Sequence, residues 1–489
     1  MRILLVTPSD RGAGFEYVHS GRENLGVEYL LAALRGAGHE AVSRNENIPG
    51  GLNSESDGLN QYGLLGFSLP FWEYRDRYVE AVNGAAGRTR ATLIIGGHAA
   101  TIGARFFLGK CPQLLGVVMG EGEETLNEIA EKLDRGESCH NVEGFMTRGG
   151  YRPRQNLMSL DELRLPARDD LQLNLLADNS IKEALVESTR GCTYRCSFCS
   201  VPPYYKYAHG KRWRERSIES LCSELTDLIT KFSEISLISF TDDNFLGFSS
   251  RFHQRAIQVA RHLHSLNPKV GFEVTCRVDA VEREPFAELA SLGLEGVYLG
   301  IESGVQRVLD SFQKGTTVKQ NLRAIQILSE LGLGCDVGFI TFSPGMKLEE
   351  VKANLEFLKN ISEEYPIFVH PGAVFRCLRE YPKDLGVEAL RGDSSRNLAK
   401  LGGPVQALYE ALDRIWHDCY EETFIRLEGN AASHKDDFDS LDRQKRITAE
   451  MIQAAFDLLA ILEARPNATS SMLVNSREVE AFSAVAGGG

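Results

Sequence analysis

Three cysteines stand close together near the middle of the chain. Cys192, Cys196 and Cys199 are spaced CxxxCxxC within the stretch STRGCTYRCSFCS. Thiolates at this spacing can converge on one metal cluster from a single loop. A closed zinc site needs four ligands, and the next candidate, His209, is ten residues further on in a basic loop. The pattern predicts a 4Fe–4S cluster with three protein ligands and one open iron; a structural zinc and buried thiols are the alternatives.

The composition is that of a folded protein built from several parts. The chain has 489 residues, of which 43% are hydrophobic and 25% charged, so disorder as the main state is excluded. At about 150 residues per domain, the length predicts roughly three units. The 67 acidic residues outnumber the 54 basic ones, and the resulting net charge of −13 repels a phosphate backbone. We therefore expect no nucleic-acid partner.

Neither a signal peptide nor a membrane span is expected. The first residues, MRILLVTP, carry one basic residue and too short an apolar run for a signal peptide. The most apolar long window, Ala91–Leu108, contains His98 and Arg105, so it lacks the ~18 uninterrupted apolar residues of a membrane helix. These features predict a cytoplasmic protein with no membrane partner.

Aliphatic runs of strand length alternate with helical stretches in residues 1–140. This pattern is typical of a doubly wound, flavodoxin-like parallel sheet of the α/β class, which binds ligands at the carboxyl ends of its strands. Residues 141–182 lose the periodicity and are predicted to be a linker. The predicted strands are Ile3–Thr7, Ala41–Arg44, Leu64–Leu69, Thr92–Ile95 and Gly116–Met119, and the helices are Val27–Ala37, Tyr74–Asn83, Ala104–Gly109 and Glu124–Leu133.

The alternation resumes in residues 183–376, with six strands, fewer than the eight of a complete TIM barrel. Residues 377–489 are predicted to be a small helical region, with helices at Val405–Tyr420 and Arg446–Ala464 and a loose tail from Asn467. The six strands are Ala184–Ser188, Ile235–Phe240, Phe272–Cys276, Gly296–Gly300, Cys335–Phe342 and Ile367–Val374, and the helices between them are Ile218–Lys231, Phe252–Leu266, Pro285–Leu292, Lys319–Leu331 and Leu348–Asn360.

The cysteine loop resembles that of radical S-adenosylmethionine enzymes, whose hallmark is CxxxCx(aromatic)C after the first strand of a partial (β/α)6 TIM-type barrel. Phe198 occupies the aromatic position. The resemblance implies that Cys192, Cys196 and Cys199 ligate a 4Fe–4S cluster whose open iron binds S-adenosylmethionine. One electron, from a donor such as flavodoxin or ferredoxin, then cleaves this cofactor to methionine and a 5′-deoxyadenosyl radical.

The resemblance extends to segments that end later barrel strands: FTDDNF at 240–245, Arg277, GIESG at 300–304 and GFITFSPG at 338–345. Strand ends of a barrel point into one mouth, where Glu302 and Ser303 can bind the ribose or the methionine amine and Arg277 the methionine carboxylate. The alternatives are structural salt bridges and a solvated turn capped by Asn244. The implied S-adenosylmethionine-binding residues are Phe198, Asp243, Asn244, Arg277, Glu302, Ser303 and Gly338.

The N-terminal domain resembles the cobalamin-binding domain that precedes the barrel in one subgroup of this family. The likeness is carried by residues 26–34, 38–40, 68, 94–98 and 120–125. Glycines at strand ends let the backbone approach a macrocycle or nucleotide tail closely. The Asp-x-His-x-x-Gly motif that supplies a lower axial histidine in mutases is absent, as it usually is in the subgroup, and some members keep the domain without using cobalamin. The implied cobalamin-binding residues are Ser68, Gly96, Gly97, Gly120, Glu121 and Gly122.

Two segments beside the barrel are open to more than one interpretation. Residues 204–216 are basic and aromatic, and they either cover the cluster and hold substrate through Arg214 and Arg216, with a tyrosine as proton or hydrogen-atom donor, or form a solvated connection that packs Trp213. Residues 376–382 depart from the Tyr-Pro-Gly-Thr that members often have, with Lys383 in place of the glycine.

The leading functional hypothesis is a cobalamin-type radical enzyme that methylates an unactivated carbon of a small-molecule, biosynthetic substrate. A second hypothesis uses the same radical for dehydration, epimerisation, cyclisation or rearrangement. A tRNA methylthiotransferase is disfavoured, because the N-terminal half lacks that family's additional cluster cysteines and the C-terminus is not a basic β-barrel. An iron–sulfur or cobalamin sensor without turnover is the alternative from another class, and the strand-end residues argue against it.

Overall fold

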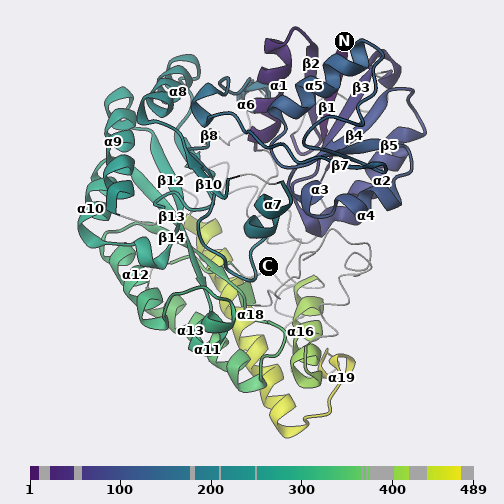
Figure 1. Ribbon diagram of the computed structural model, residues 1–489. Helices are drawn as coiled ribbons and strands as arrows, with labels where there is room; N and C mark the ends of the chain where they lie inside the picture. The colour runs from purple at the N-terminus through teal and green to yellow at the C-terminus, as the bar shows by residue number, and fades with distance from the viewer. Residues whose placement is uncertain are drawn as a thin grey trace. The chain divides into compact units, whose positions relative to one another are not determined.

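The structure is a computed structural model that describes residues 1–9, 22–48, 58–176, 182–208, 211–247, 250–365, 367–370, 373–374, 401–417 and 438–474 (Figure 1). Its described residues form two compact units. Unit 1 takes in Met1–Thr193 and Ser200–Ser239, and unit 2 takes in Tyr194–Cys199 and the described residues from Phe240 on. The predictions for His209 and for residues 376–383 lie outside the described residues. The predicted domain boundaries stay a prediction.

Unit 1 contains a seven-stranded sheet in the order β2-β1-β3-β4-β5-β6-β7. Its first five strands run parallel and the last two pair antiparallel, so the predicted parallel sheet is confirmed and extended by a hairpin. The hairpin falls in the predicted linker, where the turn at Gly149 and Gly150 joins two short strands. The strands are β1 (Arg2–Thr7), β2 (Glu40–Asn45), β3 (Leu64–Ser68), β4 (Thr92–Gly96), β5 (Leu114–Val118), β6 (Phe145–Thr147) and β7 (Gly150–Tyr151).

Helices cover both faces of this sheet, because side chains alternate between the faces along each strand. Leu4 and Val6 of β1 pack against one set of helices, whereas Ile3 and Leu5 pack against the other. The first set is α2 (Arg75–Ala86), α3 (His98–Ile102) and α4 (Ala104–Lys110), and the second is α1 (Leu25–Gly36) and α5 (Glu123–Asp134). A further helix, α6 (Asp169–Leu176), lies in the predicted linker.

The segment around the cysteine loop adds further elements to unit 1. Residues predicted as a loop at 204–216 instead contain the end of α7 and the strand β10, which pairs antiparallel with β9. The short sequence YYKYA at 204–208 shows no clear helical stripe, although Tyr205, Tyr207 and Ala208 are buried in the helix. The elements are β8 (Glu183–Val186), β9 (Thr189–Gly191), α7 (Val201–Ala208), β10 (Trp213–Glu215), α8 (Ile218–Lys231) and most of β11 (Leu237–Phe240).

Unit 2 consists of parallel strands followed by helices. Strands β12, β13 and β14 pair in that order. Of the predicted sixth strand, the described residues show only an isolated bridge between Asp336 and Phe368. The elements are β12 (Gly271–Arg277), β13 (Leu294–Glu302), β14 (Gly334–Phe339), α9 (Ser250–Leu266), α10 (Arg283–Ser291), α11 (Gln306–Ser311), α12 (Val318–Glu330) and α13 (Leu348–Glu364).

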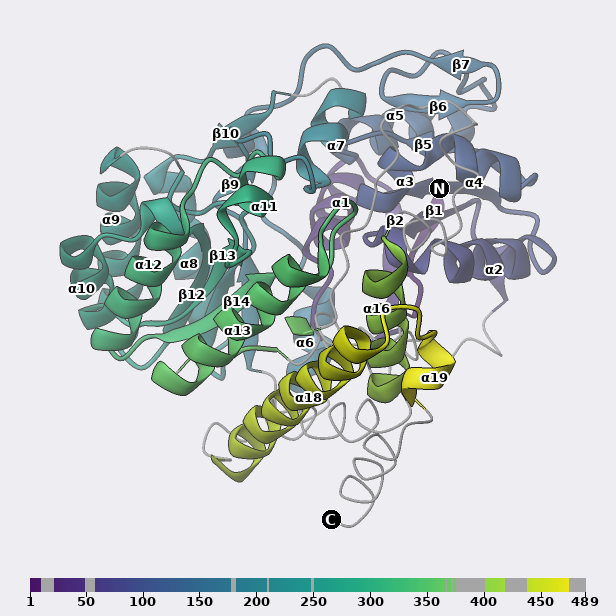
Figure 2. The same cartoon turned by 90° about the horizontal axis from the view of Figure 1, so that it is seen from below.

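The C-terminal part of unit 2 is helical, as predicted, but the tail predicted to be loose from Asn467 contains a helix at Ser470–Val474. Figure 2 shows α18 (Phe438–Ala464) running alongside α13 and α16 (Gly403–Ile415), and α19 (Ser470–Val474) packing on α16. Helix α18 begins at Phe438, eight residues before the predicted start at Arg446. The sequence SLDRQKR in its first turns carries too few apolar residues to show a helical stripe.

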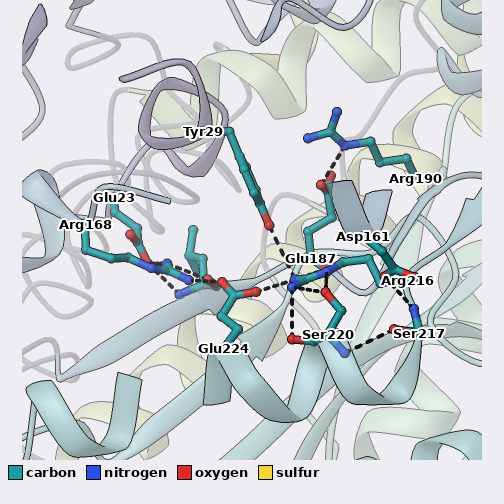
Figure 3. A network of polar contacts seen from close by, with 11 residues as sticks. Glu23, Tyr29, Asp161, Arg168, Glu187, Arg190, Arg216, Ser217, Ser220 and Glu224 are labelled. Carbon is teal, nitrogen blue, oxygen red and sulfur yellow. Dashed lines mark hydrogen bonds and ion pairs between the residues drawn. The ribbon is translucent and has the colours of Figure 1, made fainter. Parts of the chain in front are cut away.

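A buried network of ion pairs ties several segments of unit 1 together (Figure 3). Arg168 donates to Glu23 at 2.7 Å and to Glu224 of α8 at 2.5 Å, and Arg216 donates to the second oxygen of Glu224. All four side chains are at most 5% exposed. Burial raises the pKa of the Glu23 carboxyl, and the neighbouring Arg168 acts in the opposite direction. The network joins the segment before α1, the residue before α6, the connection between β10 and α8, and α8 itself.

We expect Glu224→Gln to destabilise the protein. The amide leaves two buried guanidinium groups without their shared carboxylate, and breaking a buried pair in this way costs about 3–5 kcal/mol of unfolding free energy. Asp227→Asn on the same helix is the matched control, because its ion pair with Lys231 is exposed and is worth about 0–1 kcal/mol. Urea unfolding followed by circular dichroism measures both, and equal losses in the two variants would contradict the prediction.

Candidate functional site

The cysteine loop follows β9 directly. Cys192 is half-buried and belongs to unit 1, whereas buried Cys196 and half-buried Cys199 belong to unit 2. The backbone N–H of Cys199 donates to the Cys196 carbonyl, which turns this part of the loop tightly. Within the described residues, no three His, Cys, Asp or Glu side chains are grouped closely enough to hold a metal ion. The fit to a 4Fe–4S cluster therefore rests on the donor set, three thiols on one short loop.

Unit 2 holds the 196–199 turn against the end of α11. The backbone N–H of Ser197 donates to the Phe312 carbonyl at 2.9 Å, and its hydroxyl donates to the Ser311 carbonyl. The ring of Phe198 packs on that of Phe312, with centroids 5.2 Å apart. The aromatic position of the motif thus anchors the turn by packing.

Arg277, at the end of β12, reaches the cysteine loop. One N–H of its guanidinium points at the Cys196 sulfur at 3.7 Å, and the group lies 3.6 Å from the centre of the Tyr194 ring. The other N–H groups bind both oxygens of Asp279 and the carbonyl of Lys314. Burial acts to lower the pKa of Arg277, but the hydrogen bond and charge of Asp279 outweigh it and raise the pKa. Arg277 is therefore a fixed cation beside a cluster cysteine.

Glu302, at the end of β13, has a backbone conformation rare for a residue with a side chain. Its φ is 67°, in the left-handed region, where the sheet register shifts between Gly300 and Glu302. Lys314 donates to Glu302 Oε1 at 3.0 Å, and its ammonium group lies 5.7 Å from the centre of the Phe198 ring. Lys314 thereby connects the chain around Glu302 with Phe198 and Arg277.

Sequence reasoning missed Lys314 and Asp279. Both side chains belong to short turns after β12 and α11, and neither stands in a motif. Asp279, two residues after the predicted Arg277, could have been proposed as its partner. Lys314 is brought to Glu302 and Arg277 only by the fold, so the sequence offers no signal for it.

The remaining residues predicted to bind S-adenosylmethionine have structural partners. The Ser303 hydroxyl is completely buried, donates to Asn354 and accepts from the Val305 backbone. The buried Asn244 amide donates to the Gly247 carbonyl at 2.6 Å, and Asp243 is exposed. A side chain at Gly338 would meet the Tyr298 hydroxyl at 2.7 Å. The predicted residues that the structure brings together are thus Cys196, Phe198, Arg277 and Glu302.

The residues predicted to bind cobalamin lie at the carboxyl ends of β3, β4 and β5 in unit 1. Two glycines there have positive φ and little room. A Cβ on Gly97 (φ 95°) would lie 2.9 Å from the Leu69 carbonyl oxygen, and one on Gly120 (φ 75°) would lie 2.5 Å from the Cβ of Ala208 in α7. A side chain at either position would collide with the chain itself, at the Leu69 backbone or at Ala208 of α7, so both positions require glycine. Ser68 accepts a hydrogen bond from Asn24, while Gly96 and Gly122 flank the same strand ends.

Glu121 is engaged by two arginines of the cysteine-loop segment. Arg190 donates to its Oε2 at 2.7 Å, and Arg214 donates to its Oε1. Arg214 also binds the Met158 carbonyl, and Arg216 belongs to the buried network around Glu224. Both arginines that were considered for substrate binding thus have internal partners.

A histidine and a tyrosine stack at the same end of the sheet. The rings of His98 and Tyr204 are nearly parallel, with centroids 4.6 Å apart. The Nε2 atom of His98 is buried and is among the side-chain atoms of the described residues that have no hydrogen-bond partner. Burial lowers the pKa of His98 to about 4, so its ring is neutral at physiological pH. A buried nitrogen without a partner at a strand end fits a bound polar group such as a cofactor side chain.

The described residues contain a doubly wound sheet ahead of the cysteine loop and parallel β/α elements after it. Residues 186–358 match the radical SAM superfamily, so this part of the chain is a radical SAM domain. This assignment implies a 4Fe–4S cluster and S-adenosylmethionine as cofactors, with an external electron donor and a small-molecule substrate. No helix in the described parts of the chain has both the length and the apolar character to cross a membrane.

Among similar proteins, an uncharacterized methyltransferase of Pyrococcus horikoshii is 26% identical over 75% of this chain and 80% of its own. A 4′-phospho-dehydrooxetanocin synthase of Priestia megaterium is 29% identical over 52% of this chain, which corresponds to 36% of that relative. The solved structure of the cobalamin-dependent S-adenosylmethionine radical enzyme OxsB, with aqua-cobalamin and S-adenosylmethionine, superposes with a TM-score of 0.71 at 19% identity, over 99% of this chain and 75% of that one. The likeness to this structure confirms the predicted fold class.

We expect the ionisation of His98 to make stability depend on pH. The pKa of His98 in the folded chain, about 4, lies below the ordinary value of 6.5. The contribution of the neutral His98 ring to the free energy of unfolding is therefore fully present above pH 6.5 and is lost as the pH falls toward 4. Relative to His98→Gln, the wild type should lose about 1–3 kcal/mol of unfolding free energy across that window. Urea unfolding at pH 7.5 and pH 5 measures this, and a constant difference between the two proteins would refute it.

Proposed function

We propose that this chain is a cobalamin-dependent radical SAM enzyme that methylates a carbon of a small-molecule substrate. The observation that carries the proposal is that the doubly wound sheet of unit 1 and the first cluster cysteine, Cys192, belong to one compact unit. The name of the Pyrococcus horikoshii relative and the cobalamin in OxsB support it. A flavodoxin or ferredoxin is the proposed electron donor.

Each cofactor has a proposed set of residues in this chain. Cys192, Cys196 and Cys199 hold the 4Fe–4S cluster, and the strand ends at Ser68, Gly96–Gly97 and Gly120–Gly122 hold cobalamin, with residues 1–140 as its domain and 183–376 as the barrel. When bound, the cluster and S-adenosylmethionine supply a hydrogen-abstracting radical and cobalamin supplies a methyl group. The proposed S-adenosylmethionine residues are Phe198, Asp243, Asn244, Arg277, Glu302, Ser303 and Gly338.

The side chains of unit 2 differ in what they can contribute to this binding. Arg277 is held by Asp279 and supplies a fixed positive charge beside the cluster loop, where the methionine carboxylate is negative. Lys314 fixes Glu302 through one oxygen, so the second oxygen can accept from an amine or a ribose hydroxyl. The Ser303 hydroxyl donates to Asn354 and accepts from the Val305 N–H, so Ser303 contributes by stabilising this turn.

A radical reaction without methyl transfer is the second candidate. It is favoured by the name of the Priestia megaterium relative, a synthase. The two candidates share the same cofactors and differ in the fate of the methyl group. S-Adenosylhomocysteine forms together with 5′-deoxyadenosine only if methyl groups are transferred.

We expect anaerobically reconstituted protein with S-adenosylmethionine, reductant and hydroxocobalamin to form 5′-deoxyadenosine and to retain cobalamin after desalting. Cys196→Ala should lower 5′-deoxyadenosine formation at least about 100-fold, because one of three cluster ligands is lost. Cys222→Ser, on α8 outside the loop, is the matched control and should keep it. Mass spectrometry and absorbance give both readouts. Protein with four irons that forms no 5′-deoxyadenosine would overturn the proposal.

Lys314→Met should weaken the binding of S-adenosylmethionine about tenfold. The change removes the cation that fixes Glu302 and leaves that carboxylate without its buried partner. Lys319→Met, at an exposed position on α12, is the control and should bind normally. Equilibrium dialysis of the reconstituted variants measures the dissociation constant, and an unchanged value for Lys314→Met would show that Glu302 and Lys314 do not serve this cofactor.

A further inference from the structure

Arg190 lies on β9, two residues before Cys192, and its side chain is only 9% exposed. Each nitrogen of its guanidinium donates to a different carboxylate at 2.7 Å. Nε binds Glu187, Nη1 binds Glu121 and Nη2 binds Glu123. The ring of Tyr29 lies 5.3 Å from the guanidinium carbon and covers the group. Arg190 is thus completely surrounded by acceptors and an aromatic face.

The three carboxylates come from two distant parts of the sequence within unit 1. Glu121 and Glu123 belong to the turn between β5 and α5, 69 and 67 residues before Arg190, whereas Glu187 lies between β8 and β9. The turn at 120–123 contains three of the residues predicted to bind cobalamin. Arg190 therefore joins that turn directly to the strand that leads into the cluster loop.

The ion pair between Arg190 and Glu123 joins two charged groups. Burial acts to raise the pKa of Glu123, but the nearby Arg190 charge outweighs it and lowers the pKa, so the carboxylate stays ionised. Arg214 supplies a second cation to Glu121. Only a guanidinium offers three donor directions in one plane, so a lysine at position 190 keeps the charge but loses most of the geometry.

We propose that Arg190 is a positioning residue that fixes the strand before Cys192 to the Gly120–Glu123 turn, so that Cys192 and the turn proposed to bind cobalamin move as one body. The inference rests on the proposed function for the identity of the two cofactors. It goes beyond it in naming the residue that couples their sites.

Two variants distinguish the positioning role of Arg190 from a general effect on the stability of the protein. Arg190→Lys removes the three-way fork. Arg154→Lys is the control, because Arg154 is also a partly buried arginine that binds α5 residues, Thr125 and Glu128, but it does not contact the cluster-loop strand. Both substitutions keep the charge, so net charge is constant across the comparison.

The first measurement uses the full chain without cofactors. Hydrogen–deuterium exchange followed by mass spectrometry should show faster exchange, by about tenfold, in both 118–126 and 187–193 for Arg190→Lys. Arg154→Lys should leave 187–193 unchanged. Faster exchange in only one of the two segments, or in neither, would contradict the inference that Arg190 joins them.

The second measurement uses reconstituted protein and needs no turnover. The dissociation constant for hydroxocobalamin should rise about tenfold in Arg190→Lys, which corresponds to about 1.4 kcal/mol, and should not change in Arg154→Lys. Equal affinities in all three proteins would overturn the coupling.

The two measurements keep the failure of this inference distinct from that of the proposed function. A wild type that does not bind hydroxocobalamin overturns the proposed function and, with it, the coupling of the two cofactor sites. The exchange experiment then still decides whether Arg190 joins the two segments. A wild type that binds cobalamin, with an Arg190→Lys variant that is indistinguishable from it, refutes the inference and leaves the proposed function intact.

Discussion

A buried guanidinium cannot give up its proton inside a protein, so each one must be surrounded by acceptors. Four arginines impose this constraint on the present chain. Arg168 and Arg216 share Glu224, Arg190 uses three carboxylates, and Arg277 uses Asp279 with a backbone carbonyl. The partners lie on segments that are far apart in sequence. Satisfying the arginines therefore fixes which segments of each unit must meet.

In unit 1 this constraint explains why the cysteine loop starts from a rigid base. The strand before Cys192 is paired with β10 and held by Arg190 against the turn after β5. Helix α7, which follows the loop, packs on the same end of the sheet, with Ala208 against Gly120 and Tyr204 on His98. The two glycines with positive φ, Gly97 and Gly120, are thus needed by the chain itself, whatever ligand the strand ends bind.

In unit 2 the corresponding arrangement is a smaller set of charges around one strained residue. Glu302 has a left-handed backbone that costs about 1–2 kcal/mol for a residue with a side chain, and Lys314 and the register shift of β13 hold it there. Such strain persists where the surroundings over-determine it, and it is concentrated at functional sites. Arg277 and Lys314 place two fixed cations near the turn that carries Cys196 and Phe198.

The sequence by itself determined the class of this protein and the identity of its principal residues. The spacing of three cysteines, the aliphatic runs of two α/β regions and the strand-end segments are local patterns, so they can be recognised without the fold. Contacts between distant segments decided the rest. The hydroxyl of Ser303 and the guanidinium groups of Arg214 and Arg216 have internal partners. The predicted sixth barrel strand is reduced to one bridge among the described residues. No sequence motif marks Lys314, Asp279 or the three carboxylates that bind Arg190. The physical reason is that a buried charge is matched by whichever oppositely charged group the packing brings to it, and sequence spacing contains no information on a partner 69 residues away.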